Sequence, residues 1–234
     1  MRILLLIALP LFAQIDLSLS EKSFYSPHGQ DGVLAQIFRF LRPQEKIFVE
    51  IGSGYDFFGS TTYLLKKQGW KSFQFDRLYE SRDFITAENV NSYFRLDGVP
   101  YSINLLSIRL KYNAFHIWKA INPIYRPDVV MIRYNASLPW DQSLAAEYRP
   151  YYCGDDSSYF GASLLAFFHL GRSKGYSLVY AEQSGHYLFF IRDDLLSPLS
   201  FKDMNDPEKL YRPPTYSVKE DPKHRPFLPT DNID

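Results

Sequence analysis

Two glycines separated by one residue follow a short apolar stretch, an arrangement that can bind a nucleotide-type cofactor. Residues 47–51 read Ile-Phe-Val-Glu-Ile, and Gly52, Ser53 and Gly54 follow directly. An apolar run with β-branched residues predicts a buried strand. Glycines after such a strand allow a sharp turn and let a ligand approach the backbone closely. The same residues also suit an ordinary turn between a strand and a helix, so both interpretations stay open.

The residues after this loop add two further features of a cofactor site. Residues 60–62 read Ser-Thr-Thr and offer N-cap side chains to a helix predicted through about Gln68, whose N-terminus would present free N–H groups to an anionic group. Asp76 ends a second predicted strand, at residues 72–76. It follows the glycines by about twenty residues, the spacing at which a Rossmann-like unit places the acid that binds a ribose diol. A solvent-facing aspartate at a strand end is the alternative.

Strands and helices alternate along the rest of the chain. Further strands are predicted at residues 104–110 and 127–134, a closing hairpin at residues 177–181 and 187–192, and helices at residues 33–41, 115–121 and 159–174. This order predicts an α/β fold whose sheet has a parallel centre and an antiparallel edge hairpin. The long connection through residues 139–156 suggests a lid or a substrate loop.

Composition limits the classes of function. The 234 residues fit one domain, and 26 Lys+Arg against 26 Asp+Glu give zero formal charge, so nothing global indicates nucleic-acid binding. Cys153 is the single cysteine, which excludes an intrachain disulfide. The five histidines are scattered without metal-ligand spacing, so no metal site is predicted.

The two ends of the chain differ from its middle. Residues 1–13 carry Arg2, an apolar stretch and Ala13, a pattern typical of a secretory signal peptide. Cleavage would place the protein outside the cell or in a periplasm; a buried helix or strand is the alternative and would fit a cytoplasmic protein. No later segment is long and apolar enough to predict a transmembrane helix. Residues 197–234 are rich in proline and charge and predict an extended or poorly ordered arm.

The order of short motifs across residues 24–196 resembles the FkbM-type class I methyltransferases, which use S-adenosylmethionine. The matching segments are residues 25–32, 48–52, 105–108, 118–120, 129–135, 159–164, 174–176 and 189–195. The resemblance implies a Rossmann-like three-layer sandwich with a seven-stranded sheet. It also implies that Glu50 and the loop of Gly52, Ser53 and Gly54 surround the methionine part of the cofactor, and that Asp76 binds its ribose.

The chain departs from the family where acids are expected. Relatives read Ser-Ile-Asp-Ile-Asp-Gly-Asn-Asp where residues 107–114 read Ser-Ile-Arg-Leu-Lys-Tyr-Asn-Ala, so Arg109, Lys111 and Ala114 replace three carboxylates. Arg133 replaces a fourth, in Ile-Arg-Tyr-Asn instead of Ile-Glu-Tyr-Asn. An arginine cannot ligate a divalent cation or act as an ordinary base. The predicted site therefore favours an anion.

Two functions follow from this charge reversal. In the first, the protein transfers a methyl group to the oxygen of a small or sugar-like acceptor, which Arg109, Lys111, Arg133 and Asn135 bind. In the second, it is an inactive exported relative that binds an anionic ligand or a protein partner. Export favours the second, because S-adenosylmethionine is a cytoplasmic metabolite. A third interpretation is structural: the basic residues pair with Asp56, Asp155 or Asp156.

Overall fold

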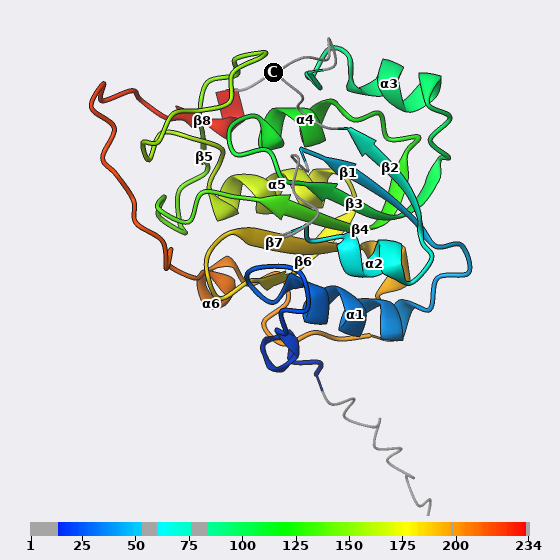
Figure 1. Ribbon diagram of the computed structural model, residues 1–234. Coiled ribbons are helices and arrows are strands. Elements are labelled where there is room, and N and C mark those ends of the chain that lie inside the picture. Colours follow the sequence, from blue (N-terminus) through cyan, green and yellow to red (C-terminus); the bar gives the residue numbers. More distant parts are fainter. Residues whose placement is uncertain (1–13, 53–59, 76–83, 198, 233–234) are drawn as a thin grey trace, which may run out of the picture.

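A six-stranded sheet forms the centre of the molecule (Figure 1). The computed structural model describes residues 14–52, 60–75, 84–197 and 199–232. The strands of this sheet are β1 (Ile47–Ile51), β2 (Lys71–Phe75), β3 (Ser102–Ile108), β4 (Arg126–Arg133), β6 (Tyr176–Ala181) and β7 (Tyr187–Arg192). Their order in space is β2-β1-β3-β4-β7-β6.

The first four strands of that order run parallel, and β7 runs antiparallel to both β4 and β6. The predicted parallel centre with an antiparallel hairpin is therefore confirmed. The family resemblance implies a seventh strand, whereas the main sheet holds six within the described residues.

Helices cover both faces of the sheet and complete a Rossmann-like α/β architecture. One face packs against α1 (Gln30–Leu41) and α2 (Tyr63–Lys67). The other packs against α3 (Val90–Leu96), α4 (Ala114–Ala120) and α5 (Leu164–Ser173). Successive residues of a strand point to opposite faces, so along β1 Phe48 joins the first core and Val49 the second.

Two helices begin differently from the sequence-based expectation. Helix α5 begins at Leu164 rather than Tyr159, because the Ser163 hydroxyl accepts a hydrogen bond from the Ala166 N–H at 3.2 Å and caps it there. At α2 the predicted N-cap bond is absent at Thr62. The Thr62 hydroxyl instead donates to Glu50, which lies on the neighbouring strand.

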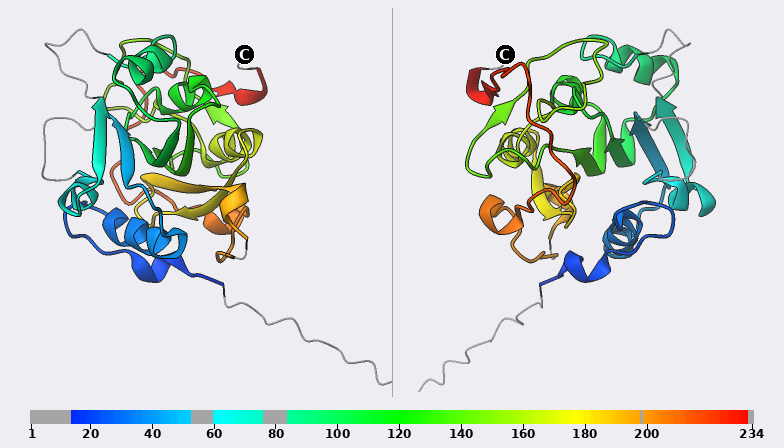
Figure 2. Two further views of the ribbon diagram at one scale, coloured as in Figure 1. Left: turned by 90° about the vertical axis from the view of Figure 1, so that its right-hand side faces the viewer. Right: turned by 60° about the vertical axis from the view of Figure 1, so that its left-hand side comes forward.

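The C-terminal segment lies against the domain. It contains α6 (Pro207–Leu210), and β8 (Leu228–Pro229) pairs with β5 (Leu144–Ala145) in a small second sheet. The right-hand view of Figure 2 shows this segment, orange to red, crossing the side of the domain from α6 to β8. Phe201 and Leu210 within it are buried. Short 3-10 helices occur at η1 (Leu17–Ser20), η2 (Asp193–Leu195) and η3 (Thr230–Asn232).

No helix in the described ranges has both the length and the apolar character that crossing a membrane requires. The predicted leader at residues 1–13 lies outside these ranges.

Candidate functional site

Three parallel strands end side by side, which brings the predicted site residues to one edge of the sheet. Ile51, Ile108 and Ile132 are register partners across β1, β3 and β4. Arg109 and Arg133 each follow their isoleucine by one residue and therefore share a face of the sheet. The carboxyl ends of parallel strands are where ligands bind in open α/β folds.

Glu50 on β1 is fully buried, and its carboxylate is enclosed by protein donors. Its Oε2 accepts hydrogen bonds from the Thr62 hydroxyl at 2.7 Å and from Gln74 Nε2 at 3.2 Å. Its Oε1 lies 3.5 Å from the Thr61 hydroxyl and 3.5 Å from Arg109 Nη1. These contacts use most of the acceptor capacity of a carboxylate. Glu50 therefore acts within the protein as the centre of a buried network.

Gly52 has the positive φ of 83° expected at a sharp turn. A Cβ added to it would lie 2.8 Å from Leu110 Cδ2 and 3.3 Å from the Leu110 nitrogen. The space that a side chain would take is thus filled by Leu110, which accounts for the glycine without a ligand. The other predicted cofactor residues, Ser53, Gly54 and Asp76, lie outside the described residues, so the proposed cofactor loop is described only at its first glycine.

Arg109 turns toward the β1 side of the edge. Its side chain is 17% exposed and forms the ion pair with Glu50. Burial disfavours the charged guanidinium, but the neighbouring Tyr187 and Glu50 outweigh it, and the pKa of Arg109 is raised overall. A structural pairing of Arg109 is thus found, with Glu50 as its partner among the described residues; Asp56, one of the predicted partners, lies outside them.

Lys111 and Arg133 line a small cavity on the β4 side. The cavity has a volume of about 80 Å³ and is closed by residues 156–160 and by the C-terminal residues 216–219, among them the cation of Lys219 and the carboxylate of Asp156. Lys111 Nζ donates to the Asp155 backbone carbonyl at 2.6 Å and lies 4.9 Å from the centre of the Phe160 ring. Burial, with Arg133 as the next cause, lowers the pKa of Lys111.

Arg133 differs from Arg109 in its surroundings. Its Nε is buried and has no hydrogen-bond partner. Within the described ranges no carboxylate forms an ion pair with it. A buried donor without a partner costs free energy that a bound acceptor would recover.

Asn135 positions the wall of this cavity. Its Nδ2 donates to the Ser158 and Phe160 carbonyls at 2.9 and 2.8 Å, and its Oδ1 accepts from the Ser137 N–H at 3.1 Å and from the Ser137 hydroxyl. The side chain is fully buried, and its hydrogen-bonding groups are occupied. Asn135 therefore fixes the loop after β4 rather than presenting a free amide.

Arg225, from the C-terminal segment, holds the same loop from outside. Its guanidinium pairs with Asp155 at 2.7 Å and Asp221 at 2.8 Å, and it lies over the Tyr159 ring at 4.4 Å. The Ser158 N–H donates to the Lys219 carbonyl at 2.7 Å. The Asp155 carboxylate, a predicted partner for the basic site residues, is thus bound by Arg225. Sequence reasoning missed this contribution of the tail.

A second group near Arg133 was also missed from the sequence. His28, Glu182 and His186 place donor atoms within 4.8 Å of one another, which makes them a candidate metal-binding group. The two imidazole rings are stacked, with centroids 4.2 Å apart and an 11° interplanar angle. Ring-nitrogen lone pairs lie in the ring plane, so in stacked rings they run side by side. One ring must turn before both can bind a single ion.

Burial makes this group largely uncharged. It raises the pKa of Glu182 to about 8, although the hydrogen bond from Gln30, 2.7 Å long, opposes the shift. It lowers the pKa of His186 to about 3, with Arg133 and His28 adding to the effect. At neutral pH, Glu182 is therefore mostly protonated and gives Arg133 little compensating charge.

Taken together, this edge of the sheet can bind an anion at Lys111 and Arg133, while its buried carboxylate, Glu50, is already engaged by protein groups. Comparison of the sequence with known protein families and with curated proteins finds no match.

Proposed function

We propose that this protein binds a small oxyanion, such as phosphate, sulfate or a carboxylate, in the cavity between Lys111 and Arg133. The observation that carries the proposal is the buried Arg133 Nε, which lacks a hydrogen-bond partner beside an open cavity. A guanidinium presents a planar fork of donors that suits an oxyanion.

The charges around the cavity support an anionic occupant. Lys111, Arg133 and Lys219 face it, against the single carboxylate of Asp156. Crowding cations in a partly buried site raises the free energy of the empty protein. An oxyanion would relieve this repulsion and supply acceptors to both Lys111 and Arg133.

The size of the cavity supports a small ligand. One water needs roughly 10–15 Å³ of such space, so about 80 Å³ holds a few waters or one compact oxyanion. Cofactor pockets are commonly about 300–1,000 Å³. This cavity therefore fits a small oxyanion.

The test is calorimetric titration of the full chain with phosphate and with sulfate, using chloride to match ionic strength. The wild-type protein should bind one oxyanion, and Arg133→Met should weaken binding by about ten- to a hundredfold, the contribution of a charge-assisted hydrogen bond. Arg39→Met is the matched control, because Arg39 is exposed on α1 and distant in the fold from the cavity. It should leave affinity unchanged.

Equal affinity in the wild-type and Arg133→Met proteins would overturn the proposal, as would the absence of binding at about 10 mM anion. Circular dichroism of both variants checks that each is folded. Arg133→Lys keeps the charge but loses the planar fork, so it should fall between the other two proteins.

S-adenosylmethionine-dependent O-methyl transfer is the second candidate. The family resemblance and the Rossmann-like sheet support it. Lys111 and Arg133 would then orient an anionic acceptor, and catalysis would rest on proximity. Titration with S-adenosylmethionine and S-adenosylhomocysteine separates the candidates: millimolar binding of either, lost in Gly54→Val, favours the enzyme, and no binding of either removes it.

A further inference from the structure

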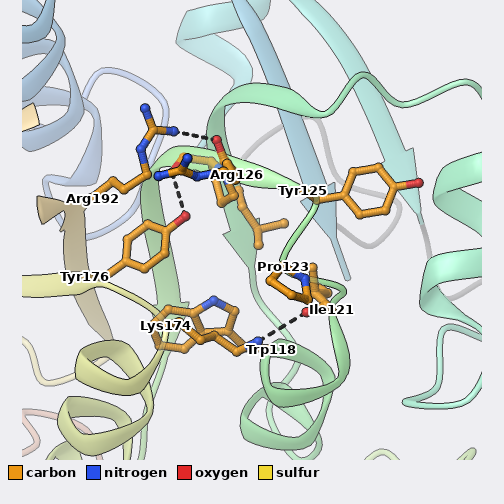
Figure 3. A pocket seen from close by; sticks show the side chains of 10 residues that line it. Trp118, Ile121, Pro123, Tyr125, Arg126, Lys174, Tyr176 and Arg192 are labelled. Carbon is orange, nitrogen blue, oxygen red and sulfur yellow. Dashed lines mark hydrogen bonds between the residues drawn. The ribbon is translucent and has the colours of Figure 1, made fainter. Parts of the chain in front are cut away.

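A second cavity lies at the opposite edge of the sheet from the oxyanion site (Figure 3). It has a volume of about 360 Å³ and opens at the amino-terminal ends of β4 and β6, beside the C-terminal ends of α4 and α5. It shares no lining residue with the Lys111 and Arg133 cavity. Its volume falls in the range of small-molecule pockets, roughly 300–1,000 Å³.

Aromatic and apolar side chains form about half of the wall of this cavity, and charged side chains form much of the rest. Trp118, Tyr125 and Tyr176 contribute rings, and Leu106, Ile121 and Pro123 contribute aliphatic surface. Trp118 is held against Phe190 at 5.0 Å and Tyr125 against Phe94 at 5.0 Å. These neighbours fix the rings, so the cavity presents a rigid surface for a flat apolar group.

Lys174 brings a cation to this apolar cavity. Its Nζ donates to the Ile121 carbonyl at 3.1 Å, a bond drawn in Figure 3. Among the described residues no carboxylate forms an ion pair with it. Burial lowers the pKa of Lys174, because an ammonium group is poorly solvated there. A bound carboxylate would supply both a counter-charge and further acceptors.

The two arginines at the rim differ in exposure and in how closely they are paired. Arg192 is 16% exposed and is fixed by Asp194 at 2.6 Å and Asp128 at 3.2 Å. Arg126 is 62% exposed and lies 3.6 Å from Asp194. Arg126 is therefore more solvated and less closely paired than Arg192, whose guanidinium is bound by two carboxylates.

We propose that this cavity binds a small aromatic carboxylate, with its ring among Trp118, Tyr125 and Ile121 and its carboxylate at Lys174. A neutral apolar ligand would bury the ammonium further without a counter-charge, which costs free energy. An inorganic oxyanion would leave the aromatic walls without a partner. An aromatic acid satisfies both parts of the cavity.

The probe is 3-phenylpropionate, compared with 3-phenylpropionamide, which lacks the charge, and propionate, which lacks the ring. Calorimetric titration of the full chain to about 10 mM covers the affinity that such small ligands reach. We expect 3-phenylpropionate to bind about ten- to a hundredfold more tightly than the amide, the contribution of a charge-assisted hydrogen bond. Propionate should bind more weakly than 3-phenylpropionate, because it buries no ring.

Lys174→Met keeps the aliphatic chain and removes the charge, so it should abolish the preference for the acid over the amide. Lys174→Arg should keep that preference. Lys46→Met, at an exposed lysine before β1, is the matched control and should change nothing.

A second measurement locates the ligand without any variant. In the wild-type protein labelled at isoleucine and valine methyl groups, 3-phenylpropionate should shift the Ile121 signal and leave the signals of Val33, on the other side of the sheet, in place. Equal binding of acid and amide, an unchanged acid preference in a folded Lys174→Met, or a stationary Ile121 signal would each overturn the proposal.

Discussion

The two arginines at the carboxyl edge of the sheet have the same local setting and different surroundings. Arg109 follows β3 and Arg133 ends β4, in neighbouring register positions on one face. Arg109 meets the buried carboxylate of Glu50, whereas no carboxylate of the described residues forms an ion pair with Arg133, which lines a cavity. The cation that has a carboxylate partner is part of the structure, and the half-buried one without such a partner is what supports the proposed anion site.

This contrast extends to the elements around each arginine. On the β1 side, Leu110 fills the space next to Gly52, and Thr61, Thr62 and Gln74 engage Glu50. On the β4 side, the wall of the cavity is a loop that the C-terminal segment holds through Arg225. The β1 side is therefore closed by packed core elements, and the β4 side is closed by the C-terminal segment.

Removing Glu50 should break the closed side, with the largest effect of the changes considered. Glu50→Ala leaves the Arg109 guanidinium buried without its carboxylate and three donors without their acceptor. We expect the free energy of unfolding to fall by about 3–5 kcal/mol, as for other broken buried ion pairs. Urea denaturation measures it.

Arg133→Met serves as the comparison for that change. Because Arg133 has no ion pair among the described residues, its loss should alter the free energy of unfolding by less than about 1 kcal/mol. Equal costs for Glu50→Ala and Arg133→Met would show that the two sides do not differ as described.

The pH dependence of stability probes the neighbours of Arg133. Burial raises the pKa of Glu182 to about 8 in the folded protein, against about 4.3 in an unfolded chain. Between these values the folded state holds a proton that the unfolded state has lost. Its contribution to stability is thus complete below about pH 4.3 and lost as the pH rises toward 8, by at most about 1.4 kcal/mol per pH unit.

The titration of His186 changes the free energy of unfolding in the opposite direction, over a lower pH range. Burial lowers its pKa to about 3 when folded, against about 6.5 unfolded, so its contribution grows between those values as the pH rises. The two effects oppose each other between about pH 4.3 and 6.5, and a net fall should follow up to pH 8. Glu182→Gln should remove that fall in urea denaturation series. A wild-type protein equally stable at pH 6.5 and 8 would contradict the assignment.

A methyl group at Gly52 tests how tightly the closed side is packed. Gly52→Ala must adopt a φ of 83° and place its Cβ 2.8 Å from Leu110 Cδ2. The backbone conformation alone costs about 1–2 kcal/mol for a residue with a Cβ. Thermal denaturation of Gly52→Ala, Leu110→Ala and the double variant separates strain from the clash.

The double variant should be more stable than the sum of the single effects predicts, because removing the Leu110 side chain relieves the contact. Additive effects would place the strain in the backbone alone. A Gly52→Ala protein as stable as the wild type would show that Leu110 leaves room beside the glycine.

Local sequence patterns predicted most of the fold. The β-branched apolar run at Ile47–Ile51 forms β1 with those bounds, and the predicted hairpin forms β6 and β7. These elements follow from side-chain periodicity, which depends on neighbours a few residues away. Helix α3 was not predicted. The pairing of β5 with β8 was not predicted either, because these two-residue strands depend on a partner far along the chain.

The sequence by itself determined the strands of the sheet, the sharp turn at Gly52 and the placement of Arg109 and Arg133 at strand ends. Each of these features depends on the pattern of residues a few positions away. Only the tertiary structure decided what those side chains meet. Glu50 reaches Arg109, Arg225 reaches Asp155, and His28 stacks on His186 across long separations in the chain. The strength of an ion pair and the pKa of a side chain depend on distances in space and on burial. Neither quantity can be read from spacing along the sequence.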